Sequence, residues 1–261
     1  MGKKSEMAQL SLGLQTQAAG ERLFEEIHAL PRLEMAYAKV RSNGGSPGPD
    51  GQSIEDCGEN LSDNLVELAA ELKSKSYRSG PVRRVSIPKP SGGERHLGIP
   101  NVRDRIVHYS IAMALEPWFE PYFSESSYGF RPGRSQRGAI EAAQKHVAKG
   151  KEWIADLDLE KFFDTVNHDR VPHLIRQKVS DPRLLKLTAL ILRSGIEIDG
   201  RVEKSSLGLP QGSPLSPLLS NIVLHQLDLE LESRGLDFVR YADDGAPGEG
   251  ASKMREGPSQ P

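Results

Sequence analysis

Hydrophobic residues recur at intervals of three and four along several stretches of the chain, which is the period of an amphipathic helix. The first such stretch, residues 21–41, is predicted to break at Pro31. Ser62 is predicted to cap the next helix, which runs to about Lys75. Further helices are predicted over residues 102–116, 136–148, 169–178, 183–192 and 213–233.

Elsewhere the pattern changes to alternation of apolar and polar residues, which is typical of strands. Residues 81–99 alternate on both sides of a Pro-Ser-Gly-Gly turn and predict a β-hairpin, and Asp199-Gly200 marks a second hairpin. Two more strands are predicted, a buried one over Trp153–Asp158 and a last one over Leu236–Tyr241. No internal repeat is visible, and the mixture of elements predicts an α+β fold.

The two ends of the chain differ from the rest. Residues 1–19 are polar without strong periodicity and are expected to be loose. Residues 245–261 contain four Gly and three Pro and no Val, Ile, Leu, Phe, Tyr or Trp. Such a segment has too little apolar surface to fold, so we expect it to be disordered.

Composition narrows the class of protein. The net charge of −2 over 261 residues excludes a uniformly basic, histone-like binder. A mean hydropathy of −0.49 and the lack of a long apolar run argue against a bilayer-spanning segment. A lone Cys57 excludes a disulfide framework and a Cys-rich zinc site. The expectation is a soluble protein of a reducing compartment.

Charge is nevertheless concentrated locally. Between Lys73 and Arg105 there are nine cations and two carboxylates, which leaves a net charge of +7. A solvated hairpin face is one interpretation, and a surface that binds the phosphates of a nucleic acid is the other.

Three segments carry candidate chemistry. Asp156 and Asp158 share one face of the predicted strand 153–158, and Asp243 and Asp244 follow the last strand. Between them, a Gly- and Pro-rich loop with Gln211 leads into a helix. Each segment alone has a structural explanation, as a capping Asp, a turn or a helix entry. Together they predict three carboxylates around two metal ions, an arrangement suited to nucleotidyl transfer.

At this point the segments resemble a reverse transcriptase, and more narrowly the bacterial group II intron reverse transcriptase/maturase family. Residues 241–244, Tyr-Ala-Asp-Asp, match the Tyr-x-Asp-Asp box of reverse transcriptases. Residues 127–135, Ser-Tyr-Gly-Phe-Arg-Pro-Gly-Arg-Ser, are close to a signature of the intron group. Residues 87–90 and 95–100 match its fingers segment, with His96 where Pro is more usual, and Gly48-Pro49-Asp50-Gly51 matches its N-terminal extension. The match covers roughly residues 25–244.

The resemblance implies a right-hand polymerase with fingers and a partial palm, without the thumb. It divides the chain into a loose segment 1–20, a helical extension of the fingers 21–76, fingers and partial palm 77–244, and an aberrant tail 245–261. It also implies an RNA-directed DNA polymerase that uses two Mg²⁺ ions, an RNA template, a DNA primer and dNTPs. Asp158, Asp243 and Asp244 fall on the catalytic, metal-binding positions, and the Leu159 carbonyl falls on a further metal-ligand position.

The family's aromatic gate lies five residues after the catalytic Asp, which selects Asp158 over Asp156 and makes Phe163 the gate. A bulky ring there would clash with a 2′ hydroxyl and favour deoxynucleotides. By resemblance, Gln211 and the Gly212 backbone border the incoming nucleotide, and Lys89 and Arg95 reach its phosphates.

The expected RNA-binding residues form two groups. Arg83 and Arg84 belong to the cationic stretch, and Arg131 and Arg134 belong to the segment 127–135. For the second group, a template-binding role and a structural role are both open.

One departure from the family is expected to matter. Gly245-Ala246-Pro247-Gly248 replaces the hydrophobic strand that follows the Tyr-x-Asp-Asp box in the family. We therefore expect a truncated fragment, weakly active or inactive, which makes no processive cDNA when alone. A family-like continuation after Asp244 is expected to restore synthesis, and Asp243→Ala in the restored chain is expected to abolish it.

Three alternatives stay open. A maturase remnant would bind group II intron RNA without catalysis, and a viral-type RNA-dependent RNA polymerase would share the palm carboxylates. Phe163 and residues 128–135 argue against the viral type, and the N-terminal extension fits the intron group better than a retron or a diversity-generating enzyme. The expected location is the bacterial cytoplasm, with no membrane partner.

Overall fold

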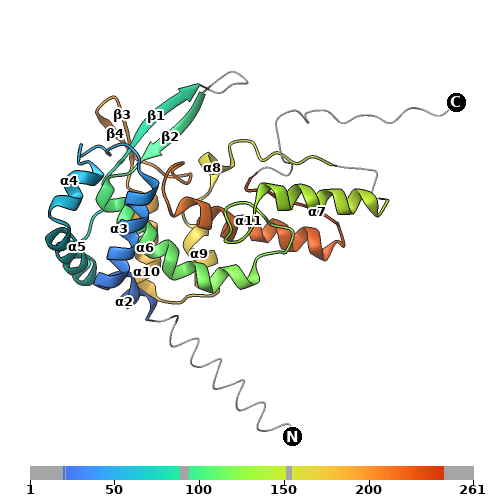
Figure 1. The fold of residues 1–261 in the computed structure, drawn as a ribbon, viewed down its shortest axis with the longest axis horizontal. Coiled ribbons are helices and arrows are strands. Elements are labelled where there is room, and N and C mark those ends of the chain that lie inside the picture. Colours follow the sequence, from blue (N-terminus) through green and yellow to red (C-terminus); the bar gives the residue numbers. More distant parts are fainter. Residues whose placement is uncertain (1–19, 21, 89–93, 151–154, 244–261) are drawn as a thin grey trace, which may run out of the picture.

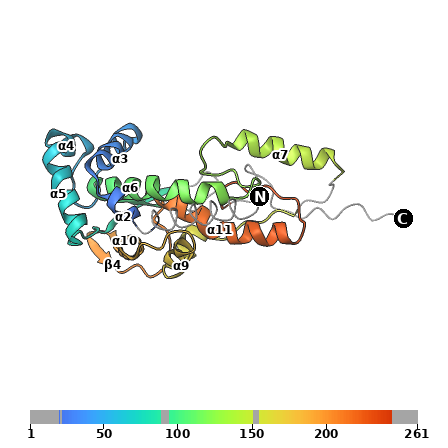
Figure 2. The ribbon, with the colours of Figure 1, turned by 90° about the horizontal axis from the view of Figure 1, so that it is seen from below.

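A computed structural model describes residue 20 and residues 22–88, 94–150 and 155–243. The described chain is elongated, and helices α3, α4 and α5 lie at the opposite end from α7 and α11 in both views (Figures 1 and 2). The expected loose segment 1–19 and the whole of the expected tail 245–261 lie outside the described residues.

Four helices form the N-terminal end: α2 (Leu23–Ile27), α3 (Leu30–Asn43), α4 (Ile54–Glu59) and α5 (Leu61–Ser74). The break predicted at Pro31 comes earlier, at residues 28–29, because Pro31 fits the first turn of α3. Ser62 is not an N-cap, since α5 already begins after Asn60. Helix α4 was not predicted, although its capping box is visible in the sequence: the Ser53 side chain accepts from the Asp56 amide, and the Asp56 carboxylate accepts from the Ser53 amide.

The two predicted hairpins are confirmed and join into one sheet. Strands β1 (Val82–Pro88) and β2 (Glu94–Ile99) pair antiparallel, as do β3 (Ile196–Ile198) and β4 (Arg201–Glu203). Val82 of β1 lies opposite Ile196 of β3 in a parallel pairing, which gives the order β2-β1-β3-β4. The tip of the first hairpin, residues 89–93, lies outside the described residues.

The remaining helices follow the predicted order: α6 (Val102–Phe119), the 3₁₀ turn η1 (Glu120–Tyr122), α7 (Gln136–Ala148), α8 (Phe162–Thr165), α9 (Arg170–Arg176), α10 (Pro182–Leu192) and α11 (Ser216–Ser233). Among these, the single turn α8 and the 3₁₀ turn η1 were not predicted. Helix α6 continues past the predicted end at residue 116 even though it contains Pro117.

Both predicted isolated strands are wrong over the residues that the structure describes. Residues 155–157 are exposed coil, with Leu157 51% exposed, and Asp158 forms only a one-residue bridge. Residues 236–239 are also coil, while Arg240 and Tyr241 each lie in an isolated bridge, that of Arg240 being parallel with Ser127. A strand needs a continuous neighbour for its backbone hydrogen bonds, and within the described residues these two segments form isolated bridges and no continuous ladder.

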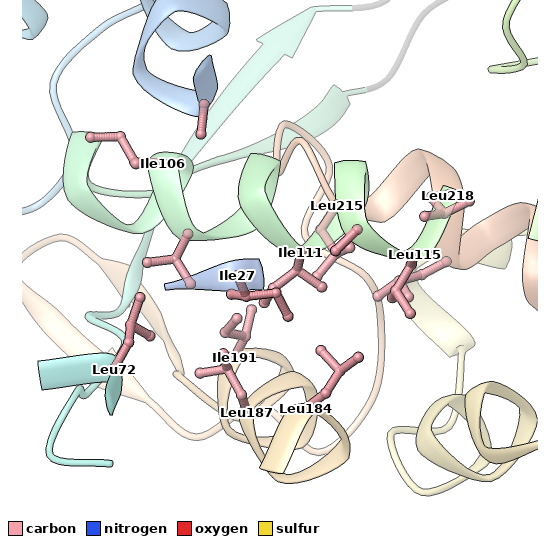
Figure 3. Packing of buried hydrophobic residues seen from close by; sticks show 14 of the residues in the cluster. Ile27, Leu72, Ile106, Ile111, Leu115, Leu184, Leu187, Ile191, Leu215 and Leu218 are labelled. Carbon is pink, nitrogen blue, oxygen red and sulfur yellow. The ribbon is translucent and has the colours of Figure 1, made fainter. Parts of the chain in front are cut away.

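The hydrophobic core is centred on α6. Its Ile111 and Leu115 are fully buried against α2, α10 and the residues that lead into α11, and Ile106 is fully buried on the side that faces α3 (Figure 3). Ile27, Leu184 and Leu215 supply the facing side chains. Each fully buried Leu or Ile contributes about 1.5–3 kcal/mol, so this contact fixes the helices on which the site is built.

Asp104 on α6 ties this core to the segment before β1. Its carboxylate is buried and accepts a hydrogen bond from the Tyr77 hydroxyl at 2.5 Å and one from the Gly80 amide at 3.0 Å. Burial raises the pKa of Asp104 to about 6, while the hydrogen bonds from Tyr77 and Gly80 act in the opposite direction. These hydrogen bonds hold residues 77–80, which lead into the hairpin β1–β2, against helix α6.

The raised pKa predicts a pH effect on stability. The folded protein holds the Asp104 proton more tightly than the unfolded chain does, so this contribution favours folding at low pH and is lost as the pH rises from about 4 to above 6. Over that range the free energy of unfolding of the wild type should fall by up to about 3 kcal/mol relative to Asp104→Asn. Urea unfolding of both proteins at pH 4 to 7 measures this difference. A difference that is independent of pH would contradict the prediction.

Candidate active site

The segment that carries the predicted gate is joined to the Gly- and Pro-rich loop by backbone contacts. The Leu209 amide donates to the Phe163 carbonyl at 2.6 Å, and the Gly208 amide donates to the Val166 carbonyl at 2.8 Å. Asn167 and Leu207 form a β-bridge. These contacts fix Phe163, which packs partly buried against the core, relative to the loop that holds Gln211.

The same loop also lies against strand β2. The Gly98 amide donates to the Gln211 carbonyl at 2.5 Å. A Cβ at Gly212 would lie 2.5 Å from the Gly98 carbonyl oxygen, and its φ of +116° is one that glycine adopts readily. Gly212 therefore allows the loop and the strand to approach closely, and residues far apart in the sequence meet at one place.

A cavity of about 370 Å³ lies where these segments meet. Its wall combines the aromatic ring of Phe163, Gln211, the β2 residues Leu97 and Gly98, and two cations, Arg84 and Lys161. The predicted gate and the predicted Gln thus line the same space. Lys161 was not singled out from the sequence, and its charge, with that of Arg84, exceeds that of the one carboxylate on this wall, Asp164.

The predicted carboxylates lie in two turns. Asp158 is exposed, and the turn that follows it closes where the Phe162 amide donates to the Leu159 carbonyl at 3.1 Å. Asp243 is half-buried and follows Ala242, whose φ is +58°. Asp244 lies outside the described residues. Two of the three predicted catalytic residues are therefore described, each at the end of a coil rather than of a regular strand.

Within the described residues, no three His, Cys, Asp or Glu side chains form a group that could hold a metal ion. The donor chemistry of Asp158 and Asp243 still fits Mg²⁺, which prefers oxygen ligands. The Leu159 carbonyl already accepts one hydrogen bond and keeps a second lone pair. A complete ligand set would need a further carboxylate, and Asp244 is the adjacent one in the sequence.

The predicted cations of the hairpin differ in what the structure describes. Lys89 lies outside the described residues, and for Arg95 the backbone alone is described, within β2. Arg84 is exposed. The Arg83 guanidinium donates to the Gly48 carbonyl, which links the hairpin to the Gly-Pro-Asp-Gly segment before α4.

Arg131 and Arg134 face inward within their own loop. Arg131 is buried, forms an ion pair with Glu120 at 2.8 Å and donates to the Ser124 and Ser127 carbonyls. Arg134 pairs with Glu125 at 2.5 Å and its guanidinium lies over the Tyr128 ring. Because these contacts occupy both guanidinium groups, the geometry favours the structural role over template binding.

Two further residues at the site were missed from the sequence. The Phe130 ring is 52% exposed and meets the Phe163 ring edge to face at 6.4 Å, from a backbone with a φ of +59°. No sequence signal indicates that conformation. Arg240 is buried beside the turn that carries Asp243, which we call the carboxylate turn (residues 240–243). A charged residue within the apolar run before Tyr241 is a sequence signal that could have identified it.

Comparison with known proteins identifies similar sequences over most of this chain. Residues 87–246 match the family profile described as reverse transcriptase (RNA-dependent DNA polymerase). Protein YkfC of Escherichia coli is 39% identical over 208 residues, which cover 78% of this chain and 55% of that protein. The group II intron-encoded protein LtrA of Lactococcus lactis is 33% identical over 196 residues, covering 74% of this chain and 32% of LtrA. The chain thus spans about half or less of the length of these relatives.

A solved structure is similar as well. A chain of the partial Cas6-RT-Cas1–Cas2 complex superposes with a TM-score of 0.56 at 27% identity, covering 85% of this chain and 37% of the other. In the described part of this chain, no helix is both long enough and apolar enough to cross a bilayer.

Proposed function

Because the chain belongs to the reverse transcriptase family and has group II intron-encoded relatives, we propose that it adds deoxynucleotides to a DNA primer paired with an RNA template. The observation that carries this proposal is the cavity that Phe163, Gln211 and β2 share. A polymerase needs a pocket in which one wall discriminates deoxyribose from ribose and another wall binds the nucleotide. Phe163, Gln211 and the β2 residues come from three separate segments and line one such cavity.

Each residue has a proposed task. Phe163 excludes a 2′ hydroxyl by its bulk, and Gln211 with the Gly212 backbone borders the base and sugar. Lys89 and Arg95 on the hairpin neutralise the triphosphate, and Arg84 and Lys161 at the cavity wall add positive charge. Residues 21–76 are proposed to form the extension of the fingers and residues 77–244 the fingers and palm.

Reverse transcriptases use divalent metal ions, and we propose that Asp158, the Leu159 carbonyl, Asp243 and Asp244 would hold two Mg²⁺ ions. When bound, the ions would supply the positive charge that activates the primer hydroxyl and stabilises the leaving pyrophosphate. The contribution of the protein is to orient the carboxylates, and this depends on the backbone of the two turns at 158–162 and 240–243.

Single-nucleotide addition tests the proposal. The chain is mixed with a DNA primer annealed to an RNA template, Mg²⁺ and either one dNTP or the matching rNTP. Addition of the dNTP in preference to the rNTP is expected. Equal use of rNTP would instead indicate an RNA polymerase. Binding of RNA without any addition, both by this chain and by one with a family-like continuation after Asp244, would indicate a non-catalytic maturase remnant.

RNA binding gives an independent prediction, from the net charge of +7 between residues 73 and 105. The affinity for structured intron RNA should fall by at least about tenfold between 50 and 200 mM salt, because bound cations displace counterions from the phosphates. Replacing Arg83, Arg84 and Lys89 together by Ala should weaken binding at 50 mM salt by about tenfold or more and flatten the salt dependence. Filter binding over a salt series measures both quantities.

A triple variant with the same loss of charge serves as the control. Arg170 and Arg176 on α9 and Lys145 on α7 are exposed and lie away from the hairpin, and their replacement by Ala should change the affinity by less than about threefold. An equal loss of RNA affinity in the two triple variants would show that net charge alone governs binding. That result would contradict the proposal that the hairpin forms the RNA-binding surface.

A further inference from the structure

Arg240 is the most extensively bonded side chain beside the carboxylate turn. Its guanidinium has five N–H groups, and each donates to a different acceptor. Two donate to the two carboxylate oxygens of Asp228 on α11, both at 2.7 Å. The others donate to the Asn221 side-chain oxygen at 3.0 Å, to the Ser127 hydroxyl at 2.7 Å and to the Ala242 carbonyl at 2.8 Å.

This group of side chains is closed to water. The Asp228 side chain is 0% exposed and the Arg240 side chain 5%, while Ser127 and Asn221 are also buried. A buried Arg–carboxylate pair gains little net stability, because removing both charges from water costs about as much as their attraction returns. The contact to the Ala242 carbonyl therefore indicates a role in geometry rather than in stability.

The loop 126–129 also holds the backbone of the turn that carries Asp243. The Arg240 amide donates to the Ser126 carbonyl at 2.9 Å, and the Tyr128 amide donates to the Arg240 carbonyl at 2.8 Å. The Asn221 side chain donates to the Gly129 carbonyl at 2.9 Å. A Cβ at Gly129 would overlap the backbone of Ala242, so the loop and the turn lie in direct contact.

The turn needs such support. Ala242 has a φ of +58°, a left-handed conformation that costs a non-glycine residue free energy and persists only when its surroundings impose it. Arg240 holds the carbonyl of Ala242 and fixes the peptide that leads to Asp243. Three parts of the chain, α11, the loop 126–129 and the turn, thus converge on one guanidinium.

We propose that Arg240, with Asp228 and Asn221, is a positioning residue that fixes the turn carrying Asp243 in the orientation needed for nucleotide addition. The proposal rests on the proposed function, since it assigns Asp243 to that site. Its role is indirect, because the Arg240 donors are all taken up inside the protein and none faces the cavity lined by Phe163.

Two variants separate positioning from stability. The double substitution Arg240→Met and Asp228→Leu replaces the ion pair by apolar side chains of similar size, so the melting temperature should stay within about 5 °C of the wild type. Arg240→Lys keeps the charge but loses the planar fork that reaches five acceptors. In both variants, amide hydrogen exchange in peptides covering residues 126–130 and 238–242 should be at least about tenfold faster.

Nucleotide addition supplies the second measurement. In both variants kcat should fall by at least about 30-fold, with KM for the dNTP changed by less than about threefold, because the turn positions the reacting groups and does not bind the nucleotide. Arg183→Met is the matched control: it removes an ion pair to the buried Asp181, far from the turn. It should lower the melting temperature and leave exchange at residues 238–242 and kcat unchanged.

Slow exchange of the turn in both variants, or fast exchange with an unchanged kcat, would overturn the proposal. If neither the wild-type chain nor one with a family-like continuation after Asp244 adds a nucleotide, the proposed function fails, and hydrogen exchange alone decides whether Arg240 holds the turn.

Discussion

Replacing Asp158 by Asn is expected to reduce the rate of single-nucleotide addition by at least about a thousandfold, equivalent to about 4 kcal/mol of transition-state stabilisation. Asn has the shape of Asp without the negative charge, so it lacks the anionic oxygen that a divalent ion requires. Asp158 is exposed and comes just before a turn, so the substitution should change the free energy of unfolding by less than about 0.5 kcal/mol. Rapid-quench measurement of the first nucleotide addition, beside a urea unfolding curve, separates the two effects.

Asp156 provides the matched control, because it lies two residues earlier in the same segment and is equally exposed. Asp156→Asn should reduce nucleotide addition by less than about threefold. The sequence alone left both residues open, and only the spacing to Phe163 favours Asp158. A large loss in Asp156→Asn with little loss in Asp158→Asn would move the catalytic position to Asp156 and the assignment of the gate with it.

The elements that the sequence predicted well are those that local chemistry determines. The hairpin 82–99, the Asp199-Gly200 turn and the helices over residues 102–119, 136–148 and 182–192 all carry their signals within about 15 residues. The Asp199-Gly200 pair has positive φ at both positions, as a two-residue hairpin turn requires. Short-range periodicity and turn residues were sufficient to predict these hairpins and helices.

The elements that it missed depend on contacts between distant parts of the chain. Residues 153–158 were predicted as a buried strand, and the described part, 155–158, is coil apart from one bridge residue. A strand forms only beside a partner, and no local pattern shows whether one is present. In the same way, the parallel pairing of Val82 with Ile196 joins segments more than a hundred residues apart and has no local signature.

The candidate site shows the same difference between local signals and contacts that join distant segments. Phe163 and Gln211 were identified by the resemblance, and their convergence on one cavity follows from hydrogen bonds that no sequence motif contains. Arg131 carried two interpretations, and its contacts with Glu120, Ser124 and Ser127 favour the structural one. The tie of Arg240 to Asp228 and Asn221 depends on α11 lying beside the turn, which is tertiary information.

Phe163→Ala is expected to lower the preference for dNTP over rNTP by at least about 100-fold, or about 2.7 kcal/mol. The ring is held in place on three sides: it packs against the core, meets the Phe162 ring at 5.7 Å and meets the Phe130 ring at 6.4 Å. A ring that cannot move aside excludes a 2′ hydroxyl by steric overlap, whereas Ala leaves room for it. The rate with dNTP should fall by less than about tenfold, since the deoxy sugar needs no such exclusion.

The neighbouring rings distinguish a gate from a packing residue. Phe162→Ala should lower the melting temperature through lost burial while keeping most of the sugar preference. Phe130→Ala removes the exposed ring that supports Phe163 from one side and should reduce the preference by about threefold, an intermediate effect. Competition between dNTP and rNTP in single-nucleotide addition measures all three variants. If Phe162→Ala relaxed the sugar preference as much as Phe163→Ala, the rings would act as one packed unit, and the assignment of the gate to Phe163 alone would be wrong.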